Sequence, residues 1–300
     1  MPHAPIALFT FNRLWHTQQT LAALLKNPEA ADTDLIIYAD GARHEKDQRA
    51  VDEVRGFLKT ITGFKSVEIV ERAHNYGLAA SIIDGVSAVV AAHGRVIVME
   101  DDLVTSPHFL SYMNAALDRY EAAEEVASIH GYCYPIAKEL PEAFFLRGAD
   151  CWGWATWARG WALFNPDGAA LLAELERRDL TYEFDYDGSY PYTAMLKNQI
   201  AGKNNSWAIR WYASAFLAEK LTLYPGRSLV HNIGNDDSGT HASAFRSFDV
   251  TVSTSEIDLS AVASQVSADA RDAFIRYFKE TQGSLWKRGL ARLVTILKRS

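Results

Sequence analysis

The sequence predicts an α/β fold in which helices flank a mostly parallel β-sheet, with further helices at the C-terminal end. In the first half of the chain, short β-branched and apolar runs alternate with helical patterns, which is typical of successive β-α-β units. One run, RVIVM at 95–99, is continuously apolar, as expected of a central strand that is buried on both faces. Polar and acidic residues follow several of these runs, at the edge where open parallel sheets bind their ligands.

The elements of the first half are marked by flanking turn residues and by hydrophobic periods. Strands are expected at 5–11, 34–40, 66–71 and 95–99. Helices are expected between them, at 16–26, 45–60 and 77–93. The second of these helices has an apolar stripe made of Val51, Val54, Phe57 and Leu58. A fourth helix begins at Pro107, because proline is tolerated in a first turn, and runs towards Glu124.

The second half is less regular. The strands expected there lie at 126–134, 143–148 and 221–226. Two helices are expected, at 167–178 and 208–220, and the segment 231–241 reads as a Gly/Asn/Asp loop. No repeat or linker divides the chain, so we expect one domain over 1–268 and a helical tail over 269–300.

Composition limits the class of partner and the compartment. The 300 residues carry a net charge of −7, so no global basic field exists and nucleic acid is not expected as a partner. The two cysteines, Cys133 and Cys151, show no zinc spacing and suit a reducing cytosol. The N-terminus lacks the pattern of a signal peptide, and the apolar stretches are shorter than a membrane span. We therefore expect a cytoplasmic protein.

Three consecutive acids follow the apolar run 95–99. Adjacent carboxylates repel one another unless a cation lies among them. Because the carboxyl ends of parallel strands meet at one sheet edge, the polar residues after the first, second and fourth strands are expected to converge. They are Asn12, Arg13, Asp40, Glu100, Asp101 and Asp102. The carboxylate oxygens among them are hard ligands, which favour Mg²⁺ or Mn²⁺ bridging to a nucleotide diphosphate. The alternative is a solvated acidic turn that caps the next helix.

Four segments, in chain order, resemble one family of enzymes. They are PIALFTFNRLWHTQQTLAALL, IIYADG, NYGLAASI and VIVMEDDLVTSPHFLSYM. These segments are similar to GT-A-fold (Rossmann-like) glycosyltransferases of the N-acetylglucosaminyltransferase I family, in a divergent bacterial-type branch. The resemblance covers about the first 130 residues. It implies an inverting, metal-dependent transfer of a sugar from a nucleotide-sugar, here a UDP-sugar, to a glycan or lipid-linked acceptor.

The resemblance also implies roles for individual residues. Asn12 belongs to the donor site, where Arg13 and Asp40 would contact the base region. Asp101 would accept a hydrogen bond from the ribose, and Glu100 would orient the donor or a metal-bound water. Asp102 would ligate the Mn²⁺ or Mg²⁺ ion that holds the diphosphate. Residues 1–130 would then form the nucleotide-binding half, and 131–268 the acceptor half.

Tryptophans gather in ADCWGWATWARGW at 149–161 and again in SWAIRW at 206–211. An indole face stacks on a sugar ring and its N–H donates to hydroxyls, so these side chains are candidates for the acceptor site. The candidates are Trp152, Trp154, Trp207 and Trp211. The alternative is a cluster that packs the core.

The residue that deprotonates the acceptor hydroxyl is not evident. In the N-acetylglucosaminyltransferase-like family the base is an Asp in a WDDW segment, whereas SWAIRW has Ala208 and Ile209 at these positions. Either the base lies elsewhere, or the chain is not an inverting enzyme of this type. The candidate bases are Asp150, which we place first, then Asp185 and Asp187.

The loop HNIGNDDSGTH at 231–241 carries two histidines and two aspartates. His241 is the candidate to complete the metal shell, as a C-terminal His does in many GT-A enzymes, and His231 is the second candidate. Asp236 and Asp237 are further options, and a plain surface loop is the alternative.

The tail 284–300 has apolar residues near one helical face and five cations on its flanks. This pattern is typical of a helix that lies on an anionic membrane surface, and a terminal helix packed on the domain is the alternative. Contact with the inner face of the cell membrane would suit a lipid-linked acceptor, as in polysaccharide biosynthesis.

Two other functions remain open. A sugar nucleotidyltransferase uses a similar sheet, but FTFNRLW lacks the glycines and the lysine of a triphosphate-binding loop. A catalytically inactive nucleotide- or sugar-binding partner of a membrane glycan-assembly complex would explain the missing acid in SWAIRW.

Overall fold

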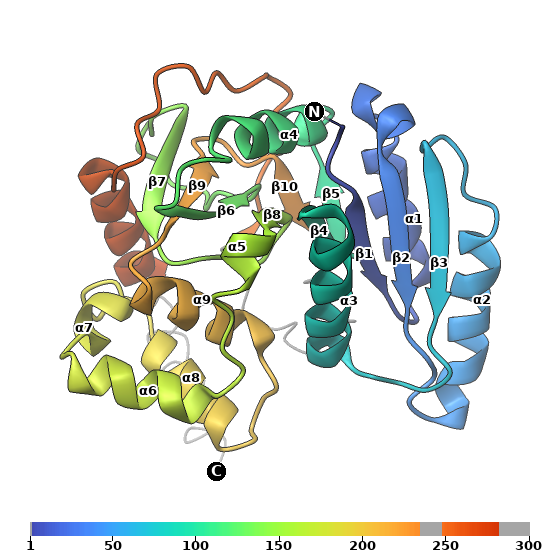
Figure 1. Cartoon of the computed structure of the whole chain (residues 1–300), viewed down its shortest axis with the longest axis horizontal. Coiled ribbons are helices and arrows are strands. Elements are labelled where there is room, and N and C mark those ends of the chain that lie inside the picture. Colours follow the sequence, from blue (N-terminus) through green and yellow to red (C-terminus); the bar gives the residue numbers. More distant parts are fainter. Residues whose placement is uncertain (1, 235–247, 282–300) are drawn as a thin grey trace, which may run out of the picture.

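An eight-stranded sheet forms the centre of the molecule (Figure 1). The computed structural model describes residues 2–234 and 248–281. The strand order is β3-β2-β1-β4-β8-β6-β9-β7. The bounds are β1 Ile6–Thr10, β2 Asp34–Ala39, β3 Ser66–Glu71, β4 Arg95–Glu100, β6 Val126–His130, β7 Ala143–Arg147, β8 Trp154–Trp157 and β9 Leu221–Pro225. Only β8 and β7 run antiparallel to their neighbours, so the predicted, mostly parallel α/β fold is confirmed.

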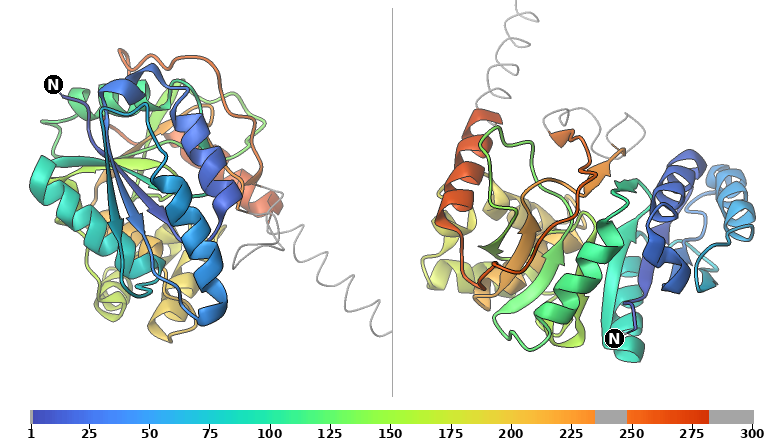
Figure 2. Two further views of the ribbon diagram at one scale, coloured as in Figure 1. Left: turned by 90° about the vertical axis from the view of Figure 1, so that its right-hand side faces the viewer. Right: turned by 90° about the horizontal axis from the view of Figure 1, so that it is seen from above.

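Helices cover both faces of the sheet (Figure 2, left). On one face lie α1 (Leu14–Leu24), α2 (Gln48–Leu58) and α4 (Phe109–Arg119). On the other face lie α3 (Leu78–His93), α5 (Ala158–Trp161) and α9 (Trp207–Leu217). Two short 3-10 helices connect elements of the first half, η1 (Pro28–Asp32) and η2 (Glu45–Asp47).

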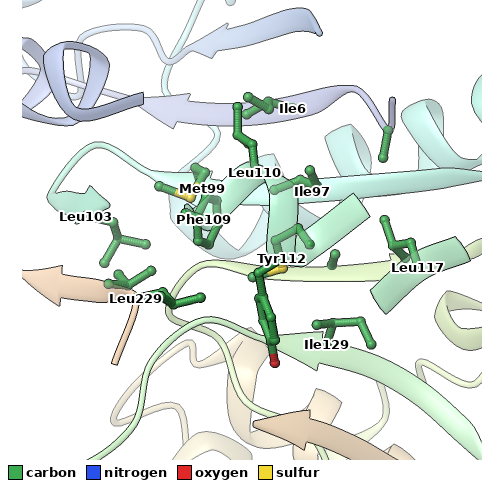
Figure 3. Close-up of a cluster of buried hydrophobic side chains, with 14 of the residues drawn as sticks. Ile6, Ile97, Met99, Leu103, Phe109, Leu110, Tyr112, Leu117, Ile129 and Leu229 are labelled. Atoms are coloured by element: carbon green, nitrogen blue, oxygen red, sulfur yellow. The ribbon is translucent and has the colours of Figure 1, made fainter. Parts of the chain in front are cut away.

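The side chains of β1 show why these strands read as continuous apolar runs. Ile6 and Leu8 enter the cluster shared with α1 and α4, part of which is drawn in Figure 3. Ala7 and Phe9, which alternate with them, enter the cluster shared with α3. Since both faces of the strand are buried, the sequence carries no polar alternation there. The predicted central strand, β4, has β1 on one side and β8 on the other.

A third hydrophobic cluster holds the helices of the second half on β7 and β9. These helices are α6 (Gly168–Arg177), α7 (Thr181–Phe184) and α8 (Tyr192–Ile200). The helix at 268–281 joins them by burying Ala270, Phe274 and Phe278. The first part of the predicted tail therefore packs against the second half of the chain and contributes to its core.

Two features of the second half differ from the sequence expectation. The Trp-rich segment forms β8, an antiparallel strand inserted between β4 and β6, where no strand was predicted. The expected loop 231–241 begins as a strand, since β10 (Val230–Asn232) pairs antiparallel with β5 (Leu103–Thr105). This small sheet returns the chain to the segment that follows the three acids. His241, Asp236, Asp237 and the tail 284–300 lie outside the described residues.

Among 2–234 and 248–281, no helix combines the length and the apolar character needed to cross a bilayer.

Candidate functional site

Arg13 is the cation that lies among the acids. It follows β1 and precedes α1, and its Nη2 donates to Oδ1 of Asp101 and, at 2.8 Å, to Oδ2 of Asp102. β1 and β4 are neighbours with Phe9 opposite Glu100, so the residues after both strands meet at one edge. The predicted convergence of Arg13 with the acidic cluster is thus present in the structure.

One arginine leaves part of the acidic charge uncompensated. Burial raises the pKa of Glu100 to about 8, with the charges of Asp102 and Asp101 adding to the rise and Arg13 opposing it. Burial also raises the pKa of Asp101 to about 6, against the lowering influence of Arg13. Burial disfavours the charged form of Arg13, but the two carboxylates outweigh it and raise its pKa. The cluster therefore favours additional positive charge, supplied by protons or by a cation.

Asp102 has one oxygen that fits a hard cation. Its Oδ2 accepts from Arg13, whereas its Oδ1 is buried and has no hydrogen-bond partner in the described part of the chain. Within residues 2–234 and 248–281, no group of three His, Cys, Asp or Glu side chains forms a closed metal cage. A single carboxylate oxygen fits Mg²⁺ or Mn²⁺ of the kind that takes its other ligands from substrate phosphates and water. The residues present thus suit a cation shared with a diphosphate.

The chain beyond β10 lies directly against Asp102. The backbone N–H of Ile233 donates to the Asp102 carbonyl at 2.8 Å. A Cβ atom on Gly234 would lie 2.1 Å from Oδ2 of Asp102 and 2.9 Å from Nη1 of Arg13. Position 234 therefore accepts glycine alone without displacement of the Arg13–Asp102 pair. His231, the second predicted metal ligand, is half-buried on β10, and its Nδ1 accepts a 3.4 Å hydrogen bond from the backbone of Val250.

Asp40 organises the loop that precedes α3. Its Oδ1 accepts from the backbone N–H groups of Gly41 (2.9 Å) and Tyr76 (2.8 Å). Its Oδ2 accepts from the backbone of Gly77 (2.9 Å) and from Nδ2 of Asn75 (3.0 Å). The buried carboxylate is thus saturated by this loop, and the base contact expected from the resemblance stays a prediction. Asn12, also assigned to the donor site, is half-buried next to Arg13 in the chain.

Asp150 lies between β7 and β8, with its side chain 22% exposed. Its Oδ1 accepts from the backbone N–H of Cys151 at 2.8 Å. Its Oδ2 lies 3.5 Å from the Tyr224 hydroxyl, which donates to it, and 3.8 Å from Nδ1 of His130. Burial raises the pKa of Cys151, and the charges of Asp150, Glu100 and Asp102 add to that rise. Cys151 is thus within electrostatic reach of both the acidic cluster and Asp150.

Three of the four acceptor-site tryptophans pack the core instead. Trp154, Trp207 and Trp211 are all buried, with ring centroids 5.5 Å (Trp154–Trp207) and 5.7 Å (Trp154–Trp211) apart. Their faces contact one another and leave none for a sugar, so the core-packing alternative holds for them. Trp152 differs, because it is half-buried and its ring lies 4.8 Å from that of Tyr132.

The other candidate bases have structural partners. Oδ1 of Asp185 accepts from the backbone N–H and the hydroxyl of Thr193 at 2.6 and 2.8 Å, at the start of α8. Asp187 forms a two-point ion pair with Arg271 at 2.6 and 2.9 Å. In SWAIRW, Ile209 is buried in α9 and Ala208 is half-buried, so the segment offers no carboxylate at either position. Asp150 remains the carboxylate that combines partial exposure with proximity to the acidic cluster.

Several tyrosines lie within electrostatic reach of Asp150, and sequence reasoning missed them. Tyr134, Tyr190 and Tyr192 are half-buried. Burial raises the pKa of each, and the charge of Asp150 contributes to each rise. Tyr190 and Tyr192 have ring centroids 4.5 Å apart, and Tyr134 lies 5.5 Å from Tyr277 of the last described helix. Their signals, YCY at 132–134 and YPY at 190–192, lie far apart in the chain and show no period.

His130 was also missed. It is fully buried at the end of β6, yet faces the Asp150 carboxylate. In the sequence it is a single histidine within the predicted strand 126–134, with no motif around it.

Comparison with known proteins gives a family match for the first half of the chain. Residues 6–152 match the family model described as Glycosyl transferase family 2. No curated protein matches the chain. Among solved structures, the mannosyltransferase PcManGT from Pyrobaculum calidifontis, in complex with GDP-Man and Mn²⁺, is 15% identical, with a TM-score of 0.31. S. aureus TarS 1-349 is 9% identical, with a TM-score of 0.40.

These solved structures are matched in part. The first match covers 44% of this chain and 36% of PcManGT, and the second covers 78% of this chain and 61% of TarS 1-349. The particular resemblance to N-acetylglucosaminyltransferase I is not confirmed by any of them. The match over residues 6–152 identifies a glycosyl transferase family 2 segment in the first half of the chain, and the mostly parallel α/β sheet is consistent with a GT-A-type fold.

Proposed function

We propose that this glycosyltransferase moves a sugar from a UDP-sugar to a glycan or lipid-linked acceptor, with inversion and with a divalent cation. The observation that carries the proposal is the position of Arg13 between Asp101 and Asp102 at the carboxyl end of the parallel strands, beside the buried free oxygen of Asp102. Ligands of open parallel sheets bind at this edge.

On the donor side, Arg13 would bind and orient the diphosphate at the start of α1. The helix N-terminus adds a partial positive charge at the same place, and the first turn of α1 contains no acid to oppose it. Asp102 Oδ1 would hold Mn²⁺ or Mg²⁺, which when bound neutralises charge on the leaving diphosphate. Asp101 would accept from the ribose through the oxygen that Arg13 does not occupy. Asp40 would shape the base site through the loop that it holds.

On the acceptor side, Asp150 would take the proton of the attacking hydroxyl. Its Oδ1 is occupied by the Cys151 N–H, whereas Oδ2 has only the longer contacts with the Tyr224 hydroxyl and His130 and would accept the proton. The half-buried rings of Trp152, Tyr134 and Tyr190 would offer faces for a sugar ring and polar groups for its hydroxyls. A carboxylate that acts directly on the acceptor corresponds to a single displacement, which inverts the anomeric centre.

Calorimetric titration with UDP, with and without Mn²⁺, tests the donor site. We expect Mn²⁺ to strengthen UDP binding to the wild-type protein, and we expect Asp102→Asn to abolish that increment. Asp32→Asn is the matched control, because Asp32 is an exposed acid at the end of η1. UDP binding that is indifferent to Mn²⁺ and to Asp102→Asn would refute the metal-assisted donor site.

A hydrolysis screen over nucleotide-sugars separates the alternatives. Slow release of free sugar from one UDP-sugar, lost in Asp150→Asn with UDP binding intact, supports transfer with Asp150 as base. Formation of a nucleotide-sugar from a sugar phosphate and a nucleoside triphosphate would favour the nucleotidyltransferase. UDP binding without turnover of any donor would favour the inactive partner.

A further inference from the structure

We propose that His130 is a positioning residue for Asp150, holding the carboxylate oxygen that faces the acceptor. This inference rests on the proposed function, in which Asp150 is the base. The imidazole is fully buried and does not reach the acceptor, so any effect on transfer passes through Asp150.

A backbone hydrogen bond fixes the tautomer of His130. The N–H of Trp152 donates to Nε2 at 3.1 Å, so Nε2 offers a lone pair and the proton of the neutral ring is on Nδ1. Nδ1 lies 3.8 Å from Oδ2 of Asp150. Burial lowers the pKa of His130, against the charge of Asp150 and a backbone hydrogen bond of Tyr132, which raise it. The contacts therefore give a neutral ring whose protonated Nδ1 lies near the carboxylate, at a distance longer than a hydrogen bond.

The packing of the ring fixes its direction. His130 is the last residue of β6 and pairs with Trp154 of β8. Trp152, whose N–H donates to the His130 ring, lies two residues before Trp154 in the chain. Its ring lies edge-on to Tyr224, with centroids 5.0 Å apart, and also contacts Tyr132 at 6.3 Å. The position of Nδ1 is thus set by the sheet and by aromatic contacts, independently of any ligand.

The two oxygens of Asp150 have different surroundings, a close donor for Oδ1 and longer polar contacts for Oδ2. Oδ1 accepts from the Cys151 N–H, while Oδ2 faces the His130 Nδ1–H and the Tyr224 hydroxyl. A separation of 3.8 Å orients the carboxylate electrostatically, and catalytic hydrogen bonds of this kind tighten when the substrate is bound. The remaining titratable groups within electrostatic reach of Asp150 are Cys151, Tyr132, Tyr134, Tyr186, Tyr190 and Tyr192. Burial raises the pKa of each, which keeps these groups neutral at physiological pH.

The first test is made on the wild-type protein. ¹⁵N NMR of the His130 ring should show a protonated Nδ1 and an unprotonated Nε2 near neutral pH. A ring protonated on Nε2 alone, or on both nitrogens, would overturn the proposal, whatever the enzyme does.

The second test compares two substitutions. In His130→Asn the amide nitrogen takes the place of Nδ1 and still donates to Asp150, whereas His130→Leu removes the donor. Removing a donor from a carboxylate disfavours its ionised form, so the acid limb of the kcat/KM profile should move to higher pH in His130→Leu. A displacement of one pH unit would lower activity on that limb about tenfold, with KM for the donor unchanged. His130→Asn should restore the wild-type profile.

Equal profiles for His130→Leu and wild type, or equal losses in the Leu and Asn variants, would refute the positioning role. Circular dichroism of each variant separates loss of the fold from loss of positioning, and the wild-type NMR result does not depend on either. If Asp150→Asn is fully active, the proposed base is wrong while the tautomer measurement stands. The two failures are therefore distinguishable.

Discussion

Gly234→Ala is the substitution whose steric effect on the candidate site follows most directly from the structure. The new Cβ would lie 2.1 Å from Oδ2 of Asp102, and ordinary van der Waals contact begins at 3.4 Å. Either the chain after β10 or the Arg13–Asp102 pair must therefore move by more than 1 Å. The close neighbours are a carboxylate held by an ion pair and a guanidinium, and neither is the free end of a flexible side chain.

The expected effect has two parts. Overpacking of this kind costs about 1 to 3 kcal/mol of folding free energy. Displacing groups that orient a metal ligand typically weakens metal binding about 10- to 100-fold, and we expect that loss in the Mn²⁺-dependent part of UDP affinity. Calorimetric titration and thermal unfolding measure the two parts separately.

Gly56→Ala is the matched control. Gly56 lies within α2, and a Cβ atom there would meet nothing within 4 Å. The same substitution should raise stability by about 0.5 to 1 kcal/mol, because glycine is unfavourable inside a helix, and it should leave UDP binding unchanged. A Gly234→Ala protein that is destabilised but binds UDP and Mn²⁺ as wild type would refute Asp102 as the metal ligand. Unchanged stability and binding would refute the close approach itself.

Two further predictions concern the acceptor half and the tail. Hydrogen bonds from Arg271 lower the pKa of Asp187 below its ordinary value of 3.8, against partial burial. This ion pair thus contributes stability above pH 3.8 that is lost as the pH falls through the lower, folded-state value. Asp187→Asn should lower the melting temperature at neutral pH, by the equivalent of about 0.2 to 1 kcal/mol, and the difference from wild type should vanish in acid; a difference independent of pH contradicts the pairing. Deletion of 284–300 should abolish co-sedimentation with anionic liposomes, and equal pelleting of the shortened chain contradicts membrane contact.

The strand ends of the first half could be predicted from the sequence because their placement follows from topology alone. Once 5–11 and 95–99 are parallel strands of one sheet, Arg13 and the acids must come to one edge. The sequence could not say that Arg13 itself bridges two of the acids, because that depends on the direction of a side chain at the start of α1. The predicted cation among the acids was a metal ion, and the structure adds a built-in arginine.

The second half of the chain was harder to predict, because its contacts join residues with no common period. β8 is a short antiparallel strand between two parallel ones, and its pairing with β6 is what brings His130 to Asp150. A Trp-rich run carries no signal that distinguishes a buried strand from an exposed sugar-binding surface. Trp154 and Trp152 are two residues apart, yet one is buried in the core and the other is half-buried.

The different environments of Trp152 and Trp154 bear on the proposed acceptor surface. Along a strand, every second side chain points to the same face. The buried ring of Trp154 points to the face covered by α3 and α9. Trp152 lies before the strand begins, beyond the glycine at position 153 whose φ of +63° turns the chain. That turn directs Trp152 away from the core cluster of Trp154 and towards Tyr132, in the layer that contains Tyr134 and Tyr190. An acceptor sugar that reaches Asp150 would therefore meet Trp152 and the tyrosines, and substitutions of Trp207 or Trp211 should act on stability alone.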